Sequence, residues 1–168
     1  MKDRYFYSMR KTVYIETSIP SYYYESRPGV KFVAWREITR EWWKTYRQFY
    51  QVVTSDAVFV ELTEGDHPHK QQKLSLLDEI EFIEHVPVLD DIVTTYVENK
   101  LVPEDAGGDA YHLAIASYYE IEFLLTWNCQ HLANPNKFKH LRIINSRLKL
   151  HTPILCTPEQ LMTDYQEN

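Results

Sequence analysis

The short apolar runs of this sequence constrain its fold more than any other feature. Four runs of β-branched or apolar residues occur at 12–15, 52–54, 123–126 and 153–155. Each is too short for a helix and is bounded by polar or turn residues, which is typical of strands. None alternates cleanly between polar and apolar residues, so both faces of each strand are expected to be buried. The runs therefore predict a mostly parallel central sheet.

Longer segments of helical period separate these runs. Apolar residues recur there at spacings of three and four, at Trp35, Ile38, Trp42, Tyr46 and Phe49 and again at Val93, Tyr96, Val97 and Leu101. Such spacing is typical of amphipathic helices. Strands that alternate with helices predict an α/β fold, a three-layer α/β/α sandwich with helices on both faces of the sheet. In such folds ligands bind at the carboxyl ends of the strands, where the strand order reverses.

The composition fits one globular domain over residues 1–168. The chain is 44% hydrophobic, without a repeat or a flexible linker, and its two cysteines lack the spacing of a metal site or disulfide framework. We expect two buried free thiols. No apolar run approaches the length of a membrane span, and the opening residues are charged where a signal peptide is apolar. The expected location is cytoplasmic, without membrane association.

A net charge of −6 argues against binding nucleic acid through the charge of the whole protein. Any such binding has to be local. Residues 136–151 offer one candidate surface, with Lys137, Lys139, Arg142, Arg147 and Lys149 and no acid. A solvated helix face explains the same segment.

Carboxylates follow the first two predicted strands. Glu16, with Thr17 and Ser18, comes directly after the first strand, and Glu61 lies in a short predicted helix after the second. Helix capping explains Thr17 or Ser18 but does not require an acid after a buried strand. Glu61 has apolar neighbours on both sides, so it lies either at the edge of an amphipathic face or in a pocket.

A third acidic position opens a later helix. Asp105 and Asp109 are four residues apart and share a helical face, where two like charges repel unless a cation lies between them. Asp105 also suits an N-cap, whereas Asp109 does not. After the third strand, Asn128 offers a neutral oxygen to a hard cation, and His131 follows it. A structural hydrogen bond is the alternative role for His131.

Taken together, these residues resemble the PIN-domain family, and in particular its toxins of the VapC type, over residues 11–162. The resemblance is carried by the segments VYIETS at 13–18, Glu61, GDAYHLAIA at 108–116, LTWN at 125–128 and PILCTPE at 153–159. It implies a Rossmann-like sandwich and a Mg²⁺- or Mn²⁺-dependent endoribonuclease. It further implies an RNA substrate, a homodimer and a cognate antitoxin protein, as in type II toxin–antitoxin pairs. An exposed aromatic surface with Trp35, Trp42, Trp43 and Tyr46 would be compatible with the homodimer.

Family members generally carry an Asp after the first strand, a Glu on an early helix, an Asp opening a later helix and an Asp after the fourth strand. Glu61 and Asp109 match the second and third positions. Glu16 stands where Asp is usual, and Asn128 stands where the last acid is usual. The loss of that negative charge should weaken a second metal position. Asp105 could supply the missing charge.

The resemblance thus assigns roles to individual residues. Glu16, Glu61 and Asp109 are expected to bind the metal, with Asp105 and Asn128 orienting its waters. Ser18 and Thr126 are expected to hydrogen-bond to the ligands. His131, Lys137, Lys139 and Arg142 are expected to contact RNA phosphates.

Two other functions stay open on the sequence. One is a catalytically weakened PIN-like module that binds RNA or protein, which Asn128 supports. The other is a different doubly wound enzyme, such as a metal-dependent phosphatase or a nucleotide-binding protein. The chain contains neither of the glycine-rich phosphate-binding motifs, GxGxxG and GxxxxGK[ST], which argues against nucleotide binding of those kinds.

Overall fold

A five-stranded sheet forms the middle of the computed structural model, which describes residues 10–105 and 107–162. The strands are β1 (Thr12–Ile15), β2 (Gln51–Ser55), β3 (Glu81–Ile83), β4 (Phe123–Leu125) and β5 (Ile154–Cys156), in the order β3-β2-β1-β4-β5. Every neighbouring pair is parallel, and Val13 of β1 lies opposite Val52 of β2 and Phe123 of β4. The predicted parallel sheet is confirmed.

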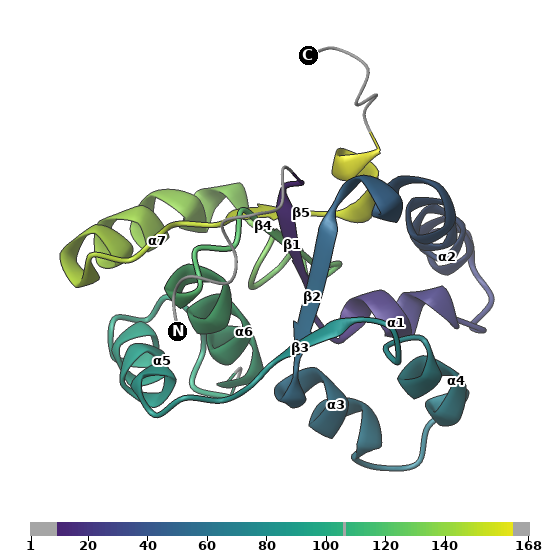
Figure 1. The fold of residues 1–168 in the computed structure, drawn as a ribbon, viewed down its shortest axis with the longest axis horizontal. Coiled ribbons are helices and arrows are strands. Elements are labelled where there is room, and N and C mark those ends of the chain that lie inside the picture. Colours follow the sequence, from purple (N-terminus) through teal and green to yellow (C-terminus); the bar gives the residue numbers. More distant parts are fainter. Residues whose placement is uncertain (1–9, 106, 163–168) are drawn as a thin grey trace.

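Helices cover both faces of this sheet (Figure 1). On one side lie α5 (Val88–Glu98), α6 (Gly107–Tyr118) and α7 (Pro135–Leu148), and on the other lie α1 (Ser18–Tyr23), α2 (Val30–Glu41) and α4 (Lys70–Ser75). The short helix α3 (Asp56–Thr63) contacts both α4 and α6. The three-layer α/β/α architecture expected from the sequence is therefore confirmed.

The strand order reverses between β1 and β4. From β1 the chain proceeds to β2 and then to β3 at one edge, and it later returns to β4 on the other side of β1. The carboxyl ends of β1 and β4 consequently flank the crevice in which ligands bind in doubly wound sheets. Glu16 follows β1 directly, and Thr126 follows β4 directly.

Most predicted elements agree with the structure, but two do not. β3 was not predicted, because Glu81-Phe82-Ile83 is a short edge strand whose first two residues are exposed. The helix expected through residue 49 is α2 followed by a π-helical turn, η2 (Trp42–Tyr46), and a 3-10 turn, η3 (Arg47–Phe49). A further 3-10 turn, η4 (Pro158–Leu161), ends the described chain.

Burial corrects two interpretations of the sequence. Trp42 and Trp43 are buried in the core, so they cannot join Trp35 and Tyr46 in an exposed aromatic surface for a homodimer. Cys156 is buried as expected, but Cys129 is exposed because it lies in the loop after β4. In the described part of the chain, no helix combines the length and the hydropathy that crossing a membrane would require.

Candidate functional site

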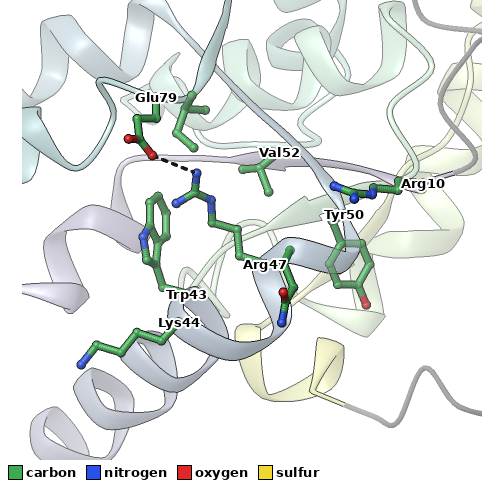
Figure 2. A pocket seen from close by; sticks show the side chains of 9 residues that line it. Arg10, Trp43, Lys44, Arg47, Tyr50, Val52 and Glu79 are labelled. Carbon is green, nitrogen blue, oxygen red and sulfur yellow. Dashed lines mark ion pairs between the residues drawn. The ribbon is translucent and has the colours of Figure 1, made fainter.

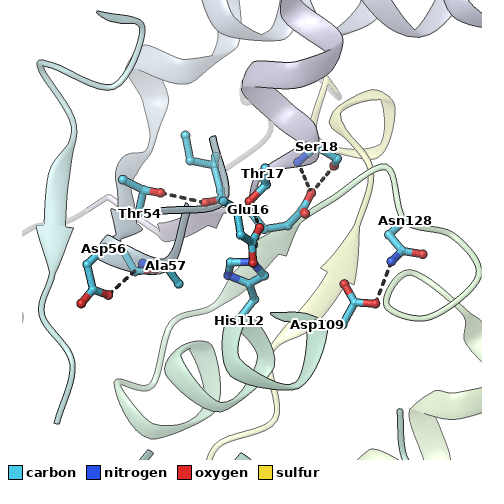
Figure 3. Close-up of polar contacts among 12 residues, drawn as sticks. Glu16, Thr17, Ser18, Thr54, Asp56, Ala57, Asp109, His112 and Asn128 are labelled. Atoms are coloured by element: carbon cyan, nitrogen blue, oxygen red, sulfur yellow. Dashed lines mark hydrogen bonds and ion pairs between the residues drawn. The ribbon is translucent and has the colours of Figure 1, made fainter. Parts of the chain in front are cut away.

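Three carboxylates from separate parts of the chain meet at the carboxyl end of the sheet. Glu16 follows β1, Glu61 projects from α3, and Asp109 lies in the first turn of α6. These three residues are called the carboxylate cluster below. Figure 3 shows Glu16 close to His112, with Asp109 beside Asn128. The fold thus brings together residues that are up to 93 positions apart, from 16 to 109.

A buried histidine that the sequence analysis did not single out links this cluster to the sheet. Nε2 of His112 lies 3.0 Å from Oε1 and 3.3 Å from Oε2 of Glu61. Its Nδ1 lies 2.6 Å from the Tyr14 hydroxyl, which in turn lies 2.8 Å from the hydroxyl of Ser55. His112 and Tyr14 are both fully buried. A continuous hydrogen-bonded chain therefore runs from β2 through β1 and α6 to Glu61.

The hydrogen bonds of this chain can all form whether the His112 imidazole is neutral or protonated. Glu61 is an acceptor when ionised, so Nε2–H of His112 donates to it. In neutral His112 the Tyr14 hydroxyl donates to Nδ1 and accepts from Ser55. In protonated His112 the Nδ1–H donates to Tyr14, which then donates to Ser55. Each buried group keeps a partner in both cases, so the chain fixes the ring in one orientation.

Charge and burial oppose one another at His112 and Glu61. Burial lowers the pKa of His112, but its hydrogen bond to Glu61 and the charges of Glu61, Glu16 and Asp109 outweigh burial, so the pKa is raised. Burial raises the pKa of Glu61, but the hydrogen bond and charge of His112 outweigh it, so that pKa is lowered. The pair is therefore stabilised in its charged form.

The two other carboxylates lack such a partner and behave differently. Burial raises the pKa of Glu16 and that of Asp109, although the charge of His112 partly opposes both shifts. Glu16 is only 5% exposed and accepts hydrogen bonds from the backbone N–H and the hydroxyl of Ser18. Buried carboxylates whose charge is incompletely compensated are favourable sites for a cation.

The start of α6 leaves room for the Glu61 carboxylate. A Cβ atom placed on Gly108 would lie 2.6 Å from Oε1 of Glu61, so any larger residue there would displace that carboxylate. The Thr17 hydroxyl donates to Oε2 of the same group. Glu61 is thus held between Thr17, Gly108 and His112, which explains why a glycine precedes Asp109 at the start of α6.

Asn128 forms a hydrogen bond where another acid would repel Asp109. Its Oδ1 accepts from the backbone N–H of His131 at 3.0 Å, and its Nδ2 donates to Oδ2 of Asp109 at 2.9 Å. A backbone N–H can only donate, so this contact fixes the orientation of the Asn128 amide. The amide oxygen of Asn128 therefore faces the backbone of His131, and the amide nitrogen faces Asp109. Asn128 thus orients Asp109 and does not itself offer its oxygen to a cation.

Of the other residues predicted for the site, Thr126 and His131 lie close to the carboxylate cluster, whereas Asp105 and the basic residues of α7 are at least partly exposed to solvent. Thr126 is buried, hydrogen-bonds to Glu16, and accepts from the backbone N–H of Asn128 at 2.8 Å. His131 lies close enough to influence Asp109 electrostatically, and its buried Nδ1 has no hydrogen-bond partner within the described structure. Asp105 is exposed in the turn before α6. On α7, Lys137 is half-buried, whereas Lys139 and Arg142 are exposed.

The carboxylate cluster has the ligand types that a divalent cation prefers, but its side chains are not arranged as a preformed metal site. The carboxylates are hard oxygen ligands of the kind that Mg²⁺ and Mn²⁺ prefer, and their burial leaves charge to be neutralised. Each is turned toward a protein partner, however. Within residues 10–105 and 107–162, no three His, Cys, Asp or Glu side chains are arranged as a ready metal site. Binding a cation would require these side chains to reorient.

The buried hydrogen-bonded chain was missed because its members look structural in the sequence. Tyr14 belongs to a strand of apolar residues, and Ser55 looks like a turn residue at the end of the next. One signal was available: His112 follows Asp109 by three residues and therefore shares its helical face. Comparison with known proteins gave no match, either to a protein-family model or to a curated protein.

Proposed function

We propose that this protein is a metal-dependent endoribonuclease, with its active site at the carboxylate cluster. The observation that carries the proposal is the meeting of Glu16, Glu61 and Asp109 around buried His112 beside the reversal of strand order. Doubly wound enzymes bind their ligands at this place. The resemblance to PIN-domain toxins supports RNA as the substrate, Mg²⁺ or Mn²⁺ as the cofactor, and a cognate antitoxin and a homodimer as partners.

The three carboxylates would hold the cation. When bound there, a divalent cation supplies a nucleophilic water at neutral pH and neutralises charge on the pentavalent transition state of phosphodiester hydrolysis. This chemistry requires no covalent protein nucleophile. Asp105 is exposed in a turn, so its role would be limited to a cation-bound water at the edge of the site.

His112 acts in this proposal as a positioning residue. Its Nε2–H holds Glu61, while Tyr14 fixes the other side of its ring. Asn128 does the same for Asp109 through its amide group. These contacts keep the carboxylates close to one another at the end of the sheet, and each carboxylate would turn from its protein partner toward the cation on binding.

RNA phosphates would be held at the edge of this site. His131 follows Asn128 in the loop after β4, and α7 begins a few residues later with Lys137 and Lys139 on its first two turns. A basic surface beside a cation-filled acidic pocket attracts RNA locally although the whole chain carries a net charge of −6.

One specific observation favours a second candidate function, an RNA- or protein-binding module with weakened catalysis. Asp109 is already paired with a neutral amide from Asn128, at the position where the resemblance leads one to expect an acid. A cation at this place would therefore meet one negative charge fewer than in family members that carry the acid.

Cleavage of a structured and an unstructured RNA tests the proposal. Purified protein is assayed with Mg²⁺, with Mn²⁺ and with EDTA, beside DNA and a phosphate monoester of a small alcohol. We expect RNA cleavage that requires the metal and is lost in Asp109→Asn. Asp91→Asn is the matched control, because Asp91 is an exposed acid in the first turn of the neighbouring helix α5.

The alternatives give different results in the same assay. Inactivity of the native protein on every RNA, with activity restored in Asn128→Asp, would favour the binding module. Hydrolysis of the phosphate monoester alone would indicate a phosphatase and contradict the ribonuclease. Asp105→Asn measures the contribution of Asp105, which we expect to be smaller than that of Asp109.

A further inference from the structure

Charge is distributed unevenly between the two outer edges of the sheet. Residues 78–91, which include the edge strand β3, contain six acids and no Lys or Arg. Residues 135–149, which include α7, contain five Lys or Arg and no acid. α7 leads into β5, the edge strand opposite β3 (Figure 1). The two segments are called the acidic edge and the basic edge below.

The acids of the acidic edge have few partners within the chain. All six are exposed to solvent. Glu79 lies 3.9 Å from Arg47, and Asp90 lies 3.3 Å from His85. Within residues 10–105 and 107–162 the other four form no ion pair, namely Asp78, Glu81, Glu84 and Asp91. Acids gathered in this way repel one another, so a positively charged partner is favoured.

The cations of the basic edge are also without carboxylate partners. Four of them are fully exposed, namely Lys139, Arg142, Arg147 and Lys149. None of the five lies within 4.0 Å of a carboxylate oxygen in the described part of the chain. Elsewhere an acid accompanies each of four arginines, which are Arg27, Arg36, Arg40 and Arg47. The basic edge is therefore suited to an acidic partner.

Both edges also expose apolar side chains among their charges. On the acidic edge Phe82 is 39% exposed and Val88 is 38% exposed. On the other side of the sheet Ile143 of α7 is 42% exposed, and Ile154 of the edge strand β5 is 48% exposed. Apolar side chains surrounded by charged ones are typical of surfaces that bind another protein.

From this distribution we infer that the acidic edge of one copy of this protein binds the basic edge of a second copy. A second copy satisfies the charges of both edges, whereas RNA would satisfy only the basic one. The two surfaces differ and lie at opposite edges of the sheet, so the contact is heterologous. It therefore continues into a chain or closes into a ring. The inference concerns assembly and does not depend on the ribonuclease proposal.

Sedimentation velocity in EDTA tests the inference on the full chain. We expect the weight-average sedimentation coefficient to rise with protein concentration in about 20 mM NaCl and to rise much less in about 500 mM NaCl, because salt screens exposed charges. Concentrations up to about 0.5 mM are needed, since contacts between exposed charges are weak. A homodimer formed through another surface would instead give a component that is insensitive to salt.

Charge reversal locates the contact. Glu81→Arg with Glu84→Arg reverses the centre of the acidic edge, and Arg142→Glu with Arg147→Glu reverses the exposed face of α7. Each double variant alone should associate at least about tenfold more weakly than the native protein in low salt. An equimolar mixture of the two should associate again, because each reversed surface then meets a complementary one. Recovery in the mixture cannot result from misfolding.

A matched control separates this contact from the effect of net charge. Glu41→Arg with Glu159→Arg changes the net charge from −6 to −2, as the acidic-edge variant does, but Glu41 and Glu159 are exposed on α2 and η4. This control should associate like the native protein. The α7 variant has a net charge of −10, so the mixture joins two negatively charged proteins and general attraction cannot explain its association.

Several results would overturn the inference. These are a native sedimentation coefficient that does not change with concentration in low salt, native-like association of either double variant alone, and a mixture that stays unassociated. Loss of association in the Glu41 and Glu159 control would show that net charge alone is responsible. Salt-dependent binding of an RNA by the basic edge, without self-association, would assign that edge to RNA and would equally contradict a second copy as its partner.

Discussion

At the carboxyl end of the sheet, Glu16, Glu61 and Asp109 surround a buried histidine, whereas at the amino end Arg10 and Arg47 line an open cavity. All five strands point the same way, so their carboxyl ends lie at one edge of the sheet and their amino ends at the opposite edge. The length of the strands therefore separates the two groups of charged side chains. Side chains that follow the strands therefore gather at one edge of the sheet, and those that precede them gather at the other.

The two ends differ in how their charges are held. His112 is 1% exposed and belongs to a chain of hydrogen bonds that joins four secondary-structure elements, β2, β1, α6 and α3. Arg47 has an aromatic contact and a 3.9 Å ion pair to an exposed carboxylate. Substitutions at the carboxyl end should therefore affect folding and function together, whereas substitutions of Arg47 at the amino end should have little effect on folding.

The largest effect on stability is expected for His112→Leu. The substitution leaves Tyr14 and Glu61 without their shared partner and should lower the free energy of unfolding by about 3 kcal/mol. Urea denaturation measures this loss. His140→Leu is the matched control, since His140 is exposed on α7, and it should change stability by less than about 0.5 kcal/mol. Equal effects of the two substitutions would contradict the structural role of His112.

A smaller loss is expected for Tyr14→Phe, about 1–2 kcal/mol, because one buried hydroxyl is removed from the chain. Tyr96→Phe is a close comparison, since the Tyr96 hydroxyl on α5 donates to Oδ1 of Asn145 on α7 at 2.6 Å. Both variants should lose similar stability, but only Tyr14→Phe should also weaken Mn²⁺ binding measured by calorimetry. Equal Mn²⁺ affinities in the two variants would show that His112 does not position Glu61.

Asp109→Asn should slightly stabilise the protein in EDTA at neutral pH. Burial raises the pKa of Asp109, so folding favours its protonated form. The stability that this group contributes is present below its unfolded pKa of about 3.8 and is lost as the pH rises through the folded pKa. The advantage of asparagine should therefore be seen at pH 7 and fade toward pH 3. Thermal unfolding at both pH values measures it, and destabilisation at pH 7 would contradict it.

The smallest effect on stability is expected at the amino end. Arg47→Gln should change the free energy of unfolding by less than about 0.5 kcal/mol, because the ion pair to Glu79 is long and exposed. The same urea denaturation measures it. A loss comparable to that of His112→Leu would mean that Arg47 has a structural role in the cavity that it lines together with Arg10 (Figure 2), and would remove the contrast between the two ends.

Much of the fold could be predicted from the sequence, because strands buried on both faces leave continuous apolar runs. Residues 12–15 match β1 without a shift, and β5 begins one residue later than predicted. β3 lacked such a run, since an edge strand is covered on fewer sides and includes Glu81 and the exposed Phe82. Local pattern therefore predicts central strands better than edge strands.

The candidate site could be predicted in part. Glu16, Glu61 and Asp109 were found because an acid beside a buried element is unusual, and the fold brings them together. His112, Tyr14 and Ser55 could not be assigned a partner, since their contacts join residues 41 to 98 positions apart. Neither was the amide orientation of Asn128 predictable, because it depends on the backbone of His131.

The rate of RNA cleavage in saturating Mn²⁺, by the native protein, Asp109→Asn and Asp91→Asn, tests the central claim most directly. The ribonuclease proposal predicts that Asp91→Asn cleaves at the native rate and that Asp109→Asn is slower by at least about a hundredfold. It also predicts that EDTA abolishes cleavage by the native protein and that added Mn²⁺ restores it. Cleavage that survives EDTA, or that proceeds equally fast in Asp109→Asn, would contradict the assignment of the carboxylate cluster as the active site.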